Sequence, residues 1–200
     1  HTGSCVHGQN GSTSVDLELV AGAYQQPIIC DGDSCSSQFD GMWLGCERNK
    51  NPGGDDDFAA RRAKMQFLSG QLTRTMEYLE SDDGSCQGEV GLTISVEATK
   101  SEYGEVATVD NYTRDDQVSV LDNLTATRTE LTFGSAKLSF NDLNYVNGLK
   151  PDNETYLCGI SDWQIGVAQE VSGCQFKNGG LPPSGYSFKA LMALTDNGTL

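Results

Sequence analysis

Apolar and polar side chains alternate at every second position in several stretches of this 200-residue chain. The alternation is clearest from Leu92 to Thr99 and from Tyr186 to Leu194, and Leu72, Met76 and Tyr78 share another apolar face. A period of two places apolar side chains on one side of a β-strand. The repeated pattern therefore predicts an all-β fold of antiparallel strands, arranged as a barrel or a sandwich.

Other stretches give weaker signals. Residues 131–140 are expected to form a pair of strands around Gly134-Ser135, and residues 163–167 a short strand. A helix is compatible with residues 57–66, where Asp57 would be the N-cap, and one or two helical turns with residues 141–149. Neither candidate helix carries a long apolar stripe with a period of 3.6 residues, so the all-β class is retained.

The chain divides into two parts by composition. Residues 1–38 are rich in glycine and serine, contain three cysteines and hold one strand-like run from Val15 to Val20. We expect this part to be an N-terminal arm stapled by disulfides. Residues 39–200 are predicted to form one domain of antiparallel strands.

Seven cysteines are unusual in a protein kept reduced in the cytosol. They are Cys5, Cys30, Cys35, Cys46, Cys86, Cys158 and Cys174. A bridge from Cys46 to Cys86 would fasten the first strong strand to a nearby hairpin, and one from Cys158 to Cys174 would close a loop around Trp163. Sequence alone leaves other pairings open, and the odd count leaves one thiol unpaired or joined to another chain.

Five Asn-x-Ser/Thr acceptors accompany the cysteines and point to a secreted, extracellular glycoprotein. The predicted glycosylation sites are Asn10, Asn111, Asn123, Asn153 and Asn197. The chain starts at His1 without a methionine, which is compatible with a mature chain whose leader has been removed. We expect the sugars to mark loops that face solvent.

The charge balance narrows the choice of partners. The chain has 28 acidic and 13 basic side chains, a formal net charge of −15. Nucleic acids and anionic membranes are polyanions, so neither is expected as a partner, and no 18-residue apolar stretch predicts a membrane span. Acidic groups at residues 31–33, 55–57, 82–83 and 115–116 lack the spacing of a calcium loop. We interpret them as solvated turns and predict no metal site.

Gly41-Met42-Trp43 opens the first strong strand and is followed by Cys46. This Gly-x-Trp resembles the calycin superfamily, which includes the lipocalins. The order of Gly-x-Trp, Cys46, Met76-Glu77-Tyr78, an acidic turn and Cys86 resembles the domain family of the adenomatosis-polyposis-coli-down-regulated secreted Wnt inhibitors. Residues 158–163 and 171–174 are similar to uncharacterised secreted lipocalin-like proteins. The resemblance spans residues 39–200 and implies an antiparallel up-and-down, calycin-like barrel of about eight strands, with Trp43 at the floor of its cavity.

A calycin-like barrel implies a carrier of a small hydrophobic ligand of lipid or pigment type. The candidate ligand-binding residues are Trp43, Met65, Phe67, Arg74, Met76, Tyr78, Phe188 and Met192. Flexible methionines and aromatic rings suit an apolar pocket, although the same residues also suit a filled core. Lipocalins pack an arginine from the last strand on this tryptophan, and none follows Tyr186 here. Arg74 is expected either to take that place or to hold the polar end of a ligand.

No enzymatic activity is predicted. His1 and His7, the only histidines, lie in the arm, so neither a Ser-His-Asp triad nor a multi-histidine zinc site is expected in the barrel. No cofactor is expected beyond a bound hydrophobic molecule. The alternative to a carrier is an extracellular structural subunit of a matrix or filament, without a small ligand. In that case residues 1–38 would join the chain to another copy or to a matrix partner.

Overall fold

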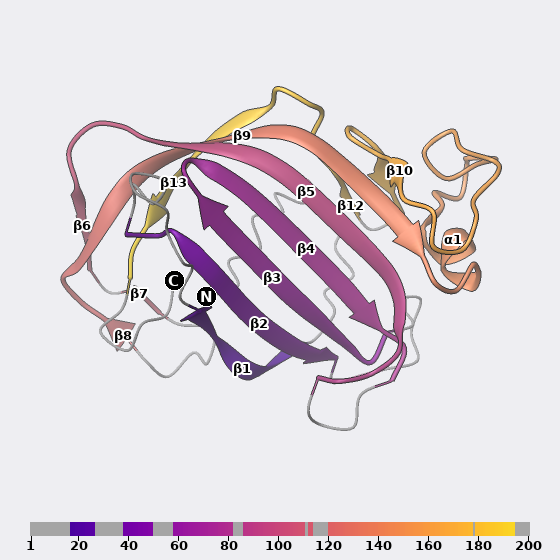
Figure 1. Cartoon of the computed structure of the whole chain (residues 1–200), viewed down its shortest axis with the longest axis horizontal. Helices are drawn as coiled ribbons and strands as arrows, with labels where there is room; N and C mark the ends of the chain where they lie inside the picture. Colours follow the sequence, from indigo (N-terminus) through magenta and orange to yellow (C-terminus); the bar gives the residue numbers. More distant parts are fainter. Residues whose placement is uncertain are drawn as a thin grey trace.

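The computed structural model describes residues 17–26, 38–49, 58–81, 86–110, 112–113, 120–177 and 179–194. In these ranges the chain is mostly antiparallel β-structure, dominated by one large sheet that curls into a half-barrel (Figure 1). The large sheet contains β1 (Leu17–Gln26), β2 (Gly41–Asn49), β3 (Ala60–Leu68), β4 (Gln71–Leu79), β5 (Val90–Glu102), β6 (Ala107–Val109), β9 (Leu124–Phe140), β10 (Gln169–Glu170) and β13 (Ser187–Met192). The smaller elements are the pair β7 (Tyr112–Thr113) and β8 (Val120–Leu121), the pair β11 (Gln175–Phe176) and β12 (Gly179–Gly180), and helix α1 (Asn144–Leu149).

The large sheet has the predicted up-and-down order over its first five strands. Each strand from β1 to β5 pairs with the next one along the chain, and β5 pairs with β9. Leu131 and Leu138 of β9 each face a residue of β5 on one side, and on the other side they face Phe188 of β13 and Gln169 of β10. Within the ranges given above, no pairing joins β1 to β10 or β13. The closed eight-stranded barrel is therefore not shown, although the curled antiparallel sheet is.

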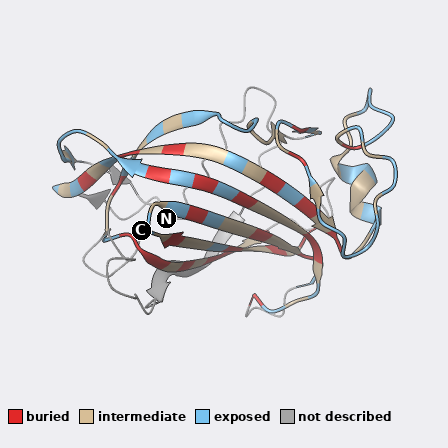
Figure 2. Ribbon diagram, turned by 45° about the horizontal axis from the view of Figure 1, so that its top comes forward, coloured by how far each residue is buried: buried red, intermediate tan, exposed pale blue. Residues whose placement is uncertain are grey.

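Two faces of the sheet follow from the strand register. Trp43, Met65, Arg74, Val96 and Ala136 lie opposite one another in a row across β2, β3, β4, β5 and β9. We call the face that carries this row the inner face. Neighbouring rows on the same face contain Phe67, Leu72, Ala98 and Phe133 on one side, and Ala63, Met76, Ile94 and Leu138 on the other. Figure 2 shows the resulting alternation of buried and exposed positions along the strands.

The inner face carries two hydrophobic clusters, one toward each end of the strands. The first, which we call the Trp43 cluster, contains buried Phe39, Trp43, Phe67, Leu72, Ala98, Leu131 and Met192. The second, which we call the β5–β9 cluster, contains buried Leu92, Val96, Ala136, Leu138, Phe140, Leu157, Val171 and Cys174. Phe188 packs on the first cluster and Tyr78 on the second. Burial of these side chains removes apolar surface from water and so stabilises the folded sheet.

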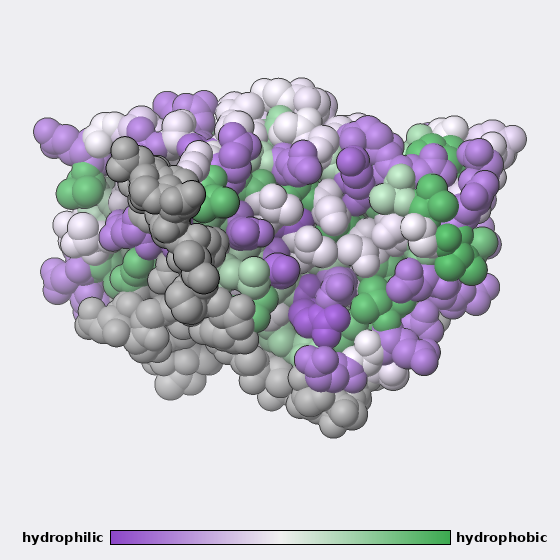
Figure 3. All heavy atoms as spheres, in the orientation of Figure 1, coloured by the Kyte–Doolittle hydropathy of each residue, from purple (hydrophilic) through white to green (hydrophobic). Residues whose placement is uncertain are grey.

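The outer face is polar. Lys64, Thr73 and Glu97 are exposed there, and Arg62 pairs with Glu77 at 2.6 Å. Only one small buried cluster lies on this side in the described ranges, formed by Cys46, Ala60, Leu79 and Cys86. In the view of Figure 3, hydrophilic and neutral side chains separate the hydrophobic ones into small patches. Because one face of the sheet is apolar and the other polar, apolar and polar residues alternate along the strands in the sequence.

The helix compatible with residues 57–66 is wrong, because residues 60–68 form strand β3. The segment is rich in Ala, Arg, Lys, Met and Gln, which all favour helices. Its residues Ala63, Met65 and Phe67 also alternate, however, and they face Gly45, Trp43 and Gly41 of β2. Pairing on both edges and burial of this row outweigh the local helix propensity. The other expected helical turns are confirmed by α1.

The pair of strands expected around Gly134-Ser135 is also wrong, because residues 124–140 form the single strand β9. Opposite β5, Ser135 faces Glu97 and Phe133 faces Ala98, so Gly134 is the extra residue of a β-bulge. A Cβ atom at Gly134 would lie 3.2 Å from the carbonyl oxygen of Glu97, which explains the glycine. The bulge keeps Phe133 and Ala136 on the same face of the sheet.

The short strand expected at residues 163–167 does not form. Only Ile165 makes a β-bridge, to Phe140, and the side chains of Ile165 and Val167 are 63% and 46% exposed. Trp163 alone packs inward, with its ring centroid 4.9 Å from that of Phe140 in a T-shaped contact. The apolar residues of this run therefore do not share one buried face.

Two disulfides cross-link the described residues, on opposite faces of the sheet. Cys46 bonds to Cys86 within the small cluster of the outer face, and Cys158 bonds to Cys174 within the β5–β9 cluster of the inner face. These are the two pairings considered from the sequence, and they are compatible with an extracellular protein. Cys5, Cys30 and Cys35 lie outside the described residues.

The strand-like run in the arm overlaps β1, which begins at Leu17 and continues to Gln26. β1 pairs with β2 of the same chain from Leu17↔Asn49 to Gln26↔Met42, with two irregularities in register. The main-chain groups of β1 that face β2 are thus used within the molecule. The alternative in which residues 1–38 join the chain to another copy or to a matrix partner stays a prediction.

Candidate functional site

Trp43 lies at the centre of the Trp43 cluster and is 1% exposed. Its indole Nε1 donates a hydrogen bond to the carbonyl oxygen of Phe39 at 3.0 Å. That bond satisfies the polar atom of a buried indole, so the ring can be enclosed by apolar groups at low cost. Trp43 therefore closes one end of the inner face.

Strand β13 contributes two of the predicted site residues to the same end. Phe188 and Met192 lie opposite Leu131 and Thr127 of β9, and their positions on β13 alternate with exposed residues. Met192 is buried in the Trp43 cluster, and Phe188 packs on it. Because β13 and β2 are separated by four strands of the sheet, their meeting in one cluster shows how far the sheet curls.

The middle of the inner face is less fully covered than its two ends. Met65, Arg74, Tyr78 and Ile94 are only half-buried, although their positions face inward. By contrast, Phe67 and Met76 on the same strands are buried. Half-buried side chains thus lie at the inner edges of both clusters: Met65 packs on the Trp43 cluster, and Tyr78 and Ile94 pack on the β5–β9 cluster.

All eight predicted ligand-binding residues lie on the inner face. Trp43, Met65, Phe67, Phe188 and Met192 belong to the Trp43 cluster or pack on it, whereas Arg74, Met76 and Tyr78 follow one another along β4. Tyr78 makes an edge contact with Phe58, at 5.1 Å between ring centroids. Their role as ligand contacts stays a prediction.

Arg74 occupies a central place on the inner face. It lies opposite Met65 of β3 and Val96 of β5, and its Nε atom is buried. Two other cations share the inner face toward the strand ends. Arg61 pairs with Glu47, and Lys100 pairs with Glu102 at 2.9 Å. Arg74 lies opposite the half-buried Met65, and Arg61 lies opposite the half-buried Tyr78.

Lys100 is a residue of this face that the sequence analysis did not single out. Its side chain is 2% exposed, and its ammonium group lies 5.2 Å from the centroid of the Phe39 ring, within range of a cation–π contact. A basic residue therefore packs on an aromatic ring of the Trp43 cluster, but it comes from β5 and not from the last strand. Continuing the alternation from Leu92 by one further step would have placed Lys100 inward.

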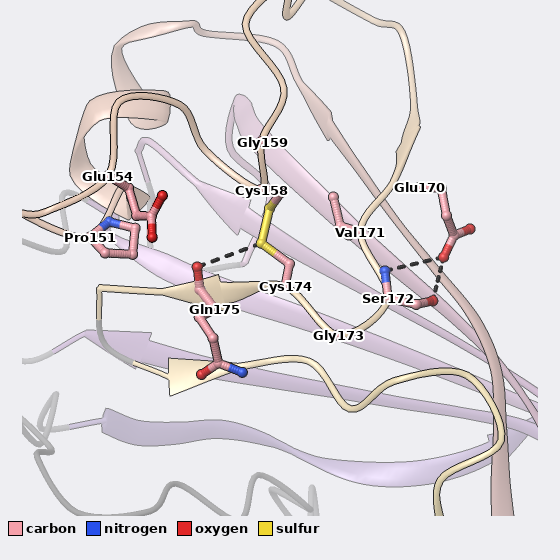
Figure 4. Close-up of a pocket in the computed structure, with 10 residues that line it drawn as sticks. All are labelled: Pro151, Glu154, Cys158, Gly159, Glu170, Val171, Ser172, Gly173, Cys174 and Gln175. Carbon is pink, nitrogen blue, oxygen red and sulfur yellow. Dashed lines mark hydrogen bonds between the residues drawn. A yellow bond between two sulfur atoms is a disulfide. The ribbon is translucent and has the colours of Figure 1, made fainter.

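A separate pocket lies beside the inner-face disulfide. It has a volume of about 350 Å³ and is lined by Pro151, Glu154, Cys158, Gly159, Glu170, Val171, Ser172, Gly173, Cys174 and Gln175. Figure 4 shows the Cys158–Cys174 bond in the middle of the pocket, with Glu154 on one side and Glu170 on the other. The pocket is more polar than the inner face. Apart from the Cys158–Cys174 bridge, sequence patterns gave no signal for it, because most of its residues lie in loops and the others in the two-residue strands β10 and β11.

Glu170 anchors one wall of this pocket to β9. Its carboxylate accepts hydrogen bonds from the Ser172 hydroxyl, from the Ser172 backbone N–H at 3.1 Å and from the Ala136 backbone N–H at 3.2 Å. The Ser172 hydroxyl bond, followed by the two backbone bonds, lowers the pKa of Glu170 below its ordinary value. These contacts stabilise the charged form of Glu170 in the folded protein.

Replacing Glu170 by glutamine is expected to destabilise the protein at neutral pH but not at acidic pH. Because the folded-state pKa of Glu170 is lowered, its stabilisation is complete above about pH 4.5 and is lost as the pH falls through the folded value. Urea unfolding of the unmodified protein and the glutamine variant, at intervals from pH 7 to pH 3, measures the gap between their free energies of unfolding. A gap that stays constant over this range would contradict the assigned role of the carboxylate.

Two of the five predicted glycosylation sites fall within the described residues. Asn123 and Asn153 are both exposed, as a glycan acceptor must be. Asn10, Asn111 and Asn197 lie outside the described side chains, as do the four acidic groups weighed as calcium ligands. In the part of the chain that the structure describes, no His, Cys, Asp or Glu side chains form a group of three or more suited to a metal ion.

Comparison of the sequence with protein-family models and with curated proteins finds no match. None of the helices in the described ranges has both the length and the apolar character needed to cross a bilayer. The site is therefore interpreted from its own geometry.

Proposed function

We propose that the protein is a secreted, glycosylated carrier of lipocalin type that binds a small hydrophobic ligand on the inner face of the curled sheet. The observation that carries this proposal is the half-buried apolar area around Met65, Tyr78 and Ile94, at the inner edges of the two buried clusters. A concave apolar surface with few polar groups is the usual form of a small-molecule site. Gly41-x-Trp43 and the up-and-down strand order support the lipocalin-type assignment.

The ligand proposed here is a hydrophobic molecule of lipid or pigment type with a polar end. Met65 and Met76 are unbranched and polarizable, so they adapt to apolar ligands of different shape. The guanidinium of Arg74 supplies positive charge in the middle of an otherwise apolar area, and it can form paired hydrogen bonds to a carboxylate. An amphipathic acid, with its chain along β3–β5 and its head toward Arg74, fits this distribution.

Binding of cis-parinaric acid, a fluorescent polyene fatty acid, tests the proposal. We expect saturable binding at one site per chain, and we expect Met65→Glu to weaken it at least tenfold, because a charge would enter the apolar area. Thr73→Glu is the matched control, because it adds the same charge on the exposed outer side of β4. Arg74→Gln is expected to weaken binding of the acid more than binding of its methyl ester.

Either of two results would overturn the carrier proposal. The first is the absence of saturable binding to the unmodified protein. The second is an equal affinity of the Met65→Glu and Thr73→Glu variants, since a ligand on the inner face must distinguish them. Circular dichroism spectra of both variants establish that each retains the sheet before their affinities are compared.

A further inference from the structure

One irregular segment covers part of the inner face. Residues 141–177, here named the covering segment, leave the sheet after β9 and place Leu157, Val171 and Cys174 in the β5–β9 cluster. Trp163 packs on Phe140 of β9 in the same cluster. Five inner-facing residues of β5 and β9 are buried in this cluster, namely Leu92, Val96, Ala136, Leu138 and Phe140, whereas Met65 and Arg74 of β3 and β4 stay half-buried.

Main-chain hydrogen bonds hold the covering segment to the sheet at its start, where the N–H groups of Asn141 and Asp142 donate to the carbonyl oxygen of Gly91, and at β10, which pairs with β9. Gly166 N–H donates to the carbonyl oxygen of Phe140 at 2.8 Å, and Val171 N–H donates to that of Ala136 at 2.7 Å. β10 has only two residues, and α1 has six. The Cys158–Cys174 bond joins two residues of this segment to each other, so the segment keeps its compact arrangement over the sheet through this internal cross-link and through its side-chain packing.

The two disulfides differ in their access to solvent. Cys46 and Cys86 are 6% and 5% exposed, and both lie in a buried cluster. Cys174 is 8% exposed and also lies in a buried cluster, but Cys158 is half-buried, and both cysteines line the pocket of about 350 Å³ described above. Thiol–disulfide exchange requires a thiolate to reach a sulfur atom, so access decides which bond reacts first. The inner-face disulfide is the accessible one of this pair.

We propose that the Cys158–Cys174 disulfide is a redox latch, and that its reduction by a dithiol releases the covering segment from the inner face. A thiolate of the dithiol attacks one sulfur atom, forms a mixed disulfide and frees the other cysteine. The second thiol of the reagent then displaces the remaining cysteine. The reagent leaves as its own disulfide, and two electrons and two protons end on Cys158 and Cys174.

Release of the segment uncovers the apolar side chains of β5 and β9. The exposed apolar surface then extends from the half-buried area on β3–β5 to the sheet residues of the β5–β9 cluster, while the Trp43 cluster stays packed. This inference deepens the proposed function, because it adds control over the surface to which the ligand binds. The inference is tested by the reactivity of the two disulfides and by the hydrogen exchange of the covering segment, and neither measurement needs a ligand.

The test uses the folded protein and graded dithiothreitol. Alkylation by iodoacetamide at timed intervals, followed by peptide mass spectrometry, reports which cysteines have been freed. We expect Cys158 and Cys174 to be alkylated at least tenfold faster than Cys46 and Cys86. Hydrogen exchange at the same times is expected to show faster exchange of the Ala136 and Val171 amides, while amides of β2 and β3 stay protected.

A double variant, Cys158→Ala with Cys174→Ala, is expected to show the faster exchange without any reductant. In the matched variant, Cys46→Ala with Cys86→Ala, exchange of the same amides is expected still to respond to dithiothreitol. Reduction of Cys46–Cys86 first or at the same rate would overturn the inference, and so would unchanged exchange after Cys158–Cys174 is reduced. If the latch opens as expected but cis-parinaric acid never binds, the carrier proposal fails and the latch stands.

Discussion

Replacing Trp43 by alanine is expected to lower the free energy of unfolding by about 3–5 kcal/mol. The side chain is 1% exposed and packs against residues from β3, β4, β5, β9 and β13 in a single cluster. Its removal would leave a large cavity that these strands cannot fill without changing the curl of the sheet. Urea unfolding followed by far-ultraviolet circular dichroism measures the difference.

Two further variants separate the causes of this loss. Trp43→Phe keeps an aromatic ring but removes the hydrogen bond to the Phe39 carbonyl oxygen, so we expect a loss smaller than that of the alanine variant. Leu191→Ala, at a 51% exposed position of β13, is expected to change stability by less than about 0.5 kcal/mol. A loss below about 1 kcal/mol for Trp43→Ala would contradict its place in the core.

Removing the outer-face disulfide by the double change Cys46→Ala and Cys86→Ala is expected to destabilise the protein by about 4 kcal/mol. The bond closes a loop with a sequence separation of 40, so most of its effect is expected to arise from the unfolded chain, whose freedom it restricts. The change also removes two buried sulfur atoms from the cluster with Ala60 and Leu79. The unfolding midpoint in urea gives the size of the effect.

The inner-face disulfide provides a comparison for this prediction. Its sequence separation is 16, so the chain-entropy model gives a smaller loss of about 3 kcal/mol for Cys158→Ala with Cys174→Ala. We therefore expect the outer-face variant to be the less stable of the two. The reverse order would show that packing of the covering segment, and not restriction of the unfolded chain, dominates the contribution of these bonds.

The sheet could be predicted from the sequence because its two faces differ in polarity. Leu72, Met76 and Tyr78 alternate with polar residues on β4, and the structure places all three inward. The same reasoning failed on β3, where Arg61, Arg62 and Lys64 gave a helix-like composition. Pairing with β2 and β4 on its two edges determines that this segment is a strand, and these partners lie outside any local window of sequence.

The candidate site could be predicted only where it lies on regular strands. Arg74, Met76 and Tyr78 were identified because a strand fixes which side chains share a face, and Trp43 was identified from the Gly-x-Trp resemblance. The covering segment and its pocket were not predicted, because loop residues have no period from which to infer their direction. Lys100 was missed for a different reason: a lysine at the end of an alternating run is usually solvated, and here Phe39 and Glu102 hold it inside.

The position of β9 in the sheet has a consequence for how the chain acquires its structure. β9 pairs with β5 on one side and with β13 and β10 on the other, and it begins only at Leu124. During synthesis, the hairpins from β1 to β5 can form first, but they have no apolar layer to pack against until residues 124–192 emerge from the ribosome. The nascent strands β1 to β5 therefore expose their apolar face for much of translation. Such exposure favours slow completion of the fold and assistance by chaperones.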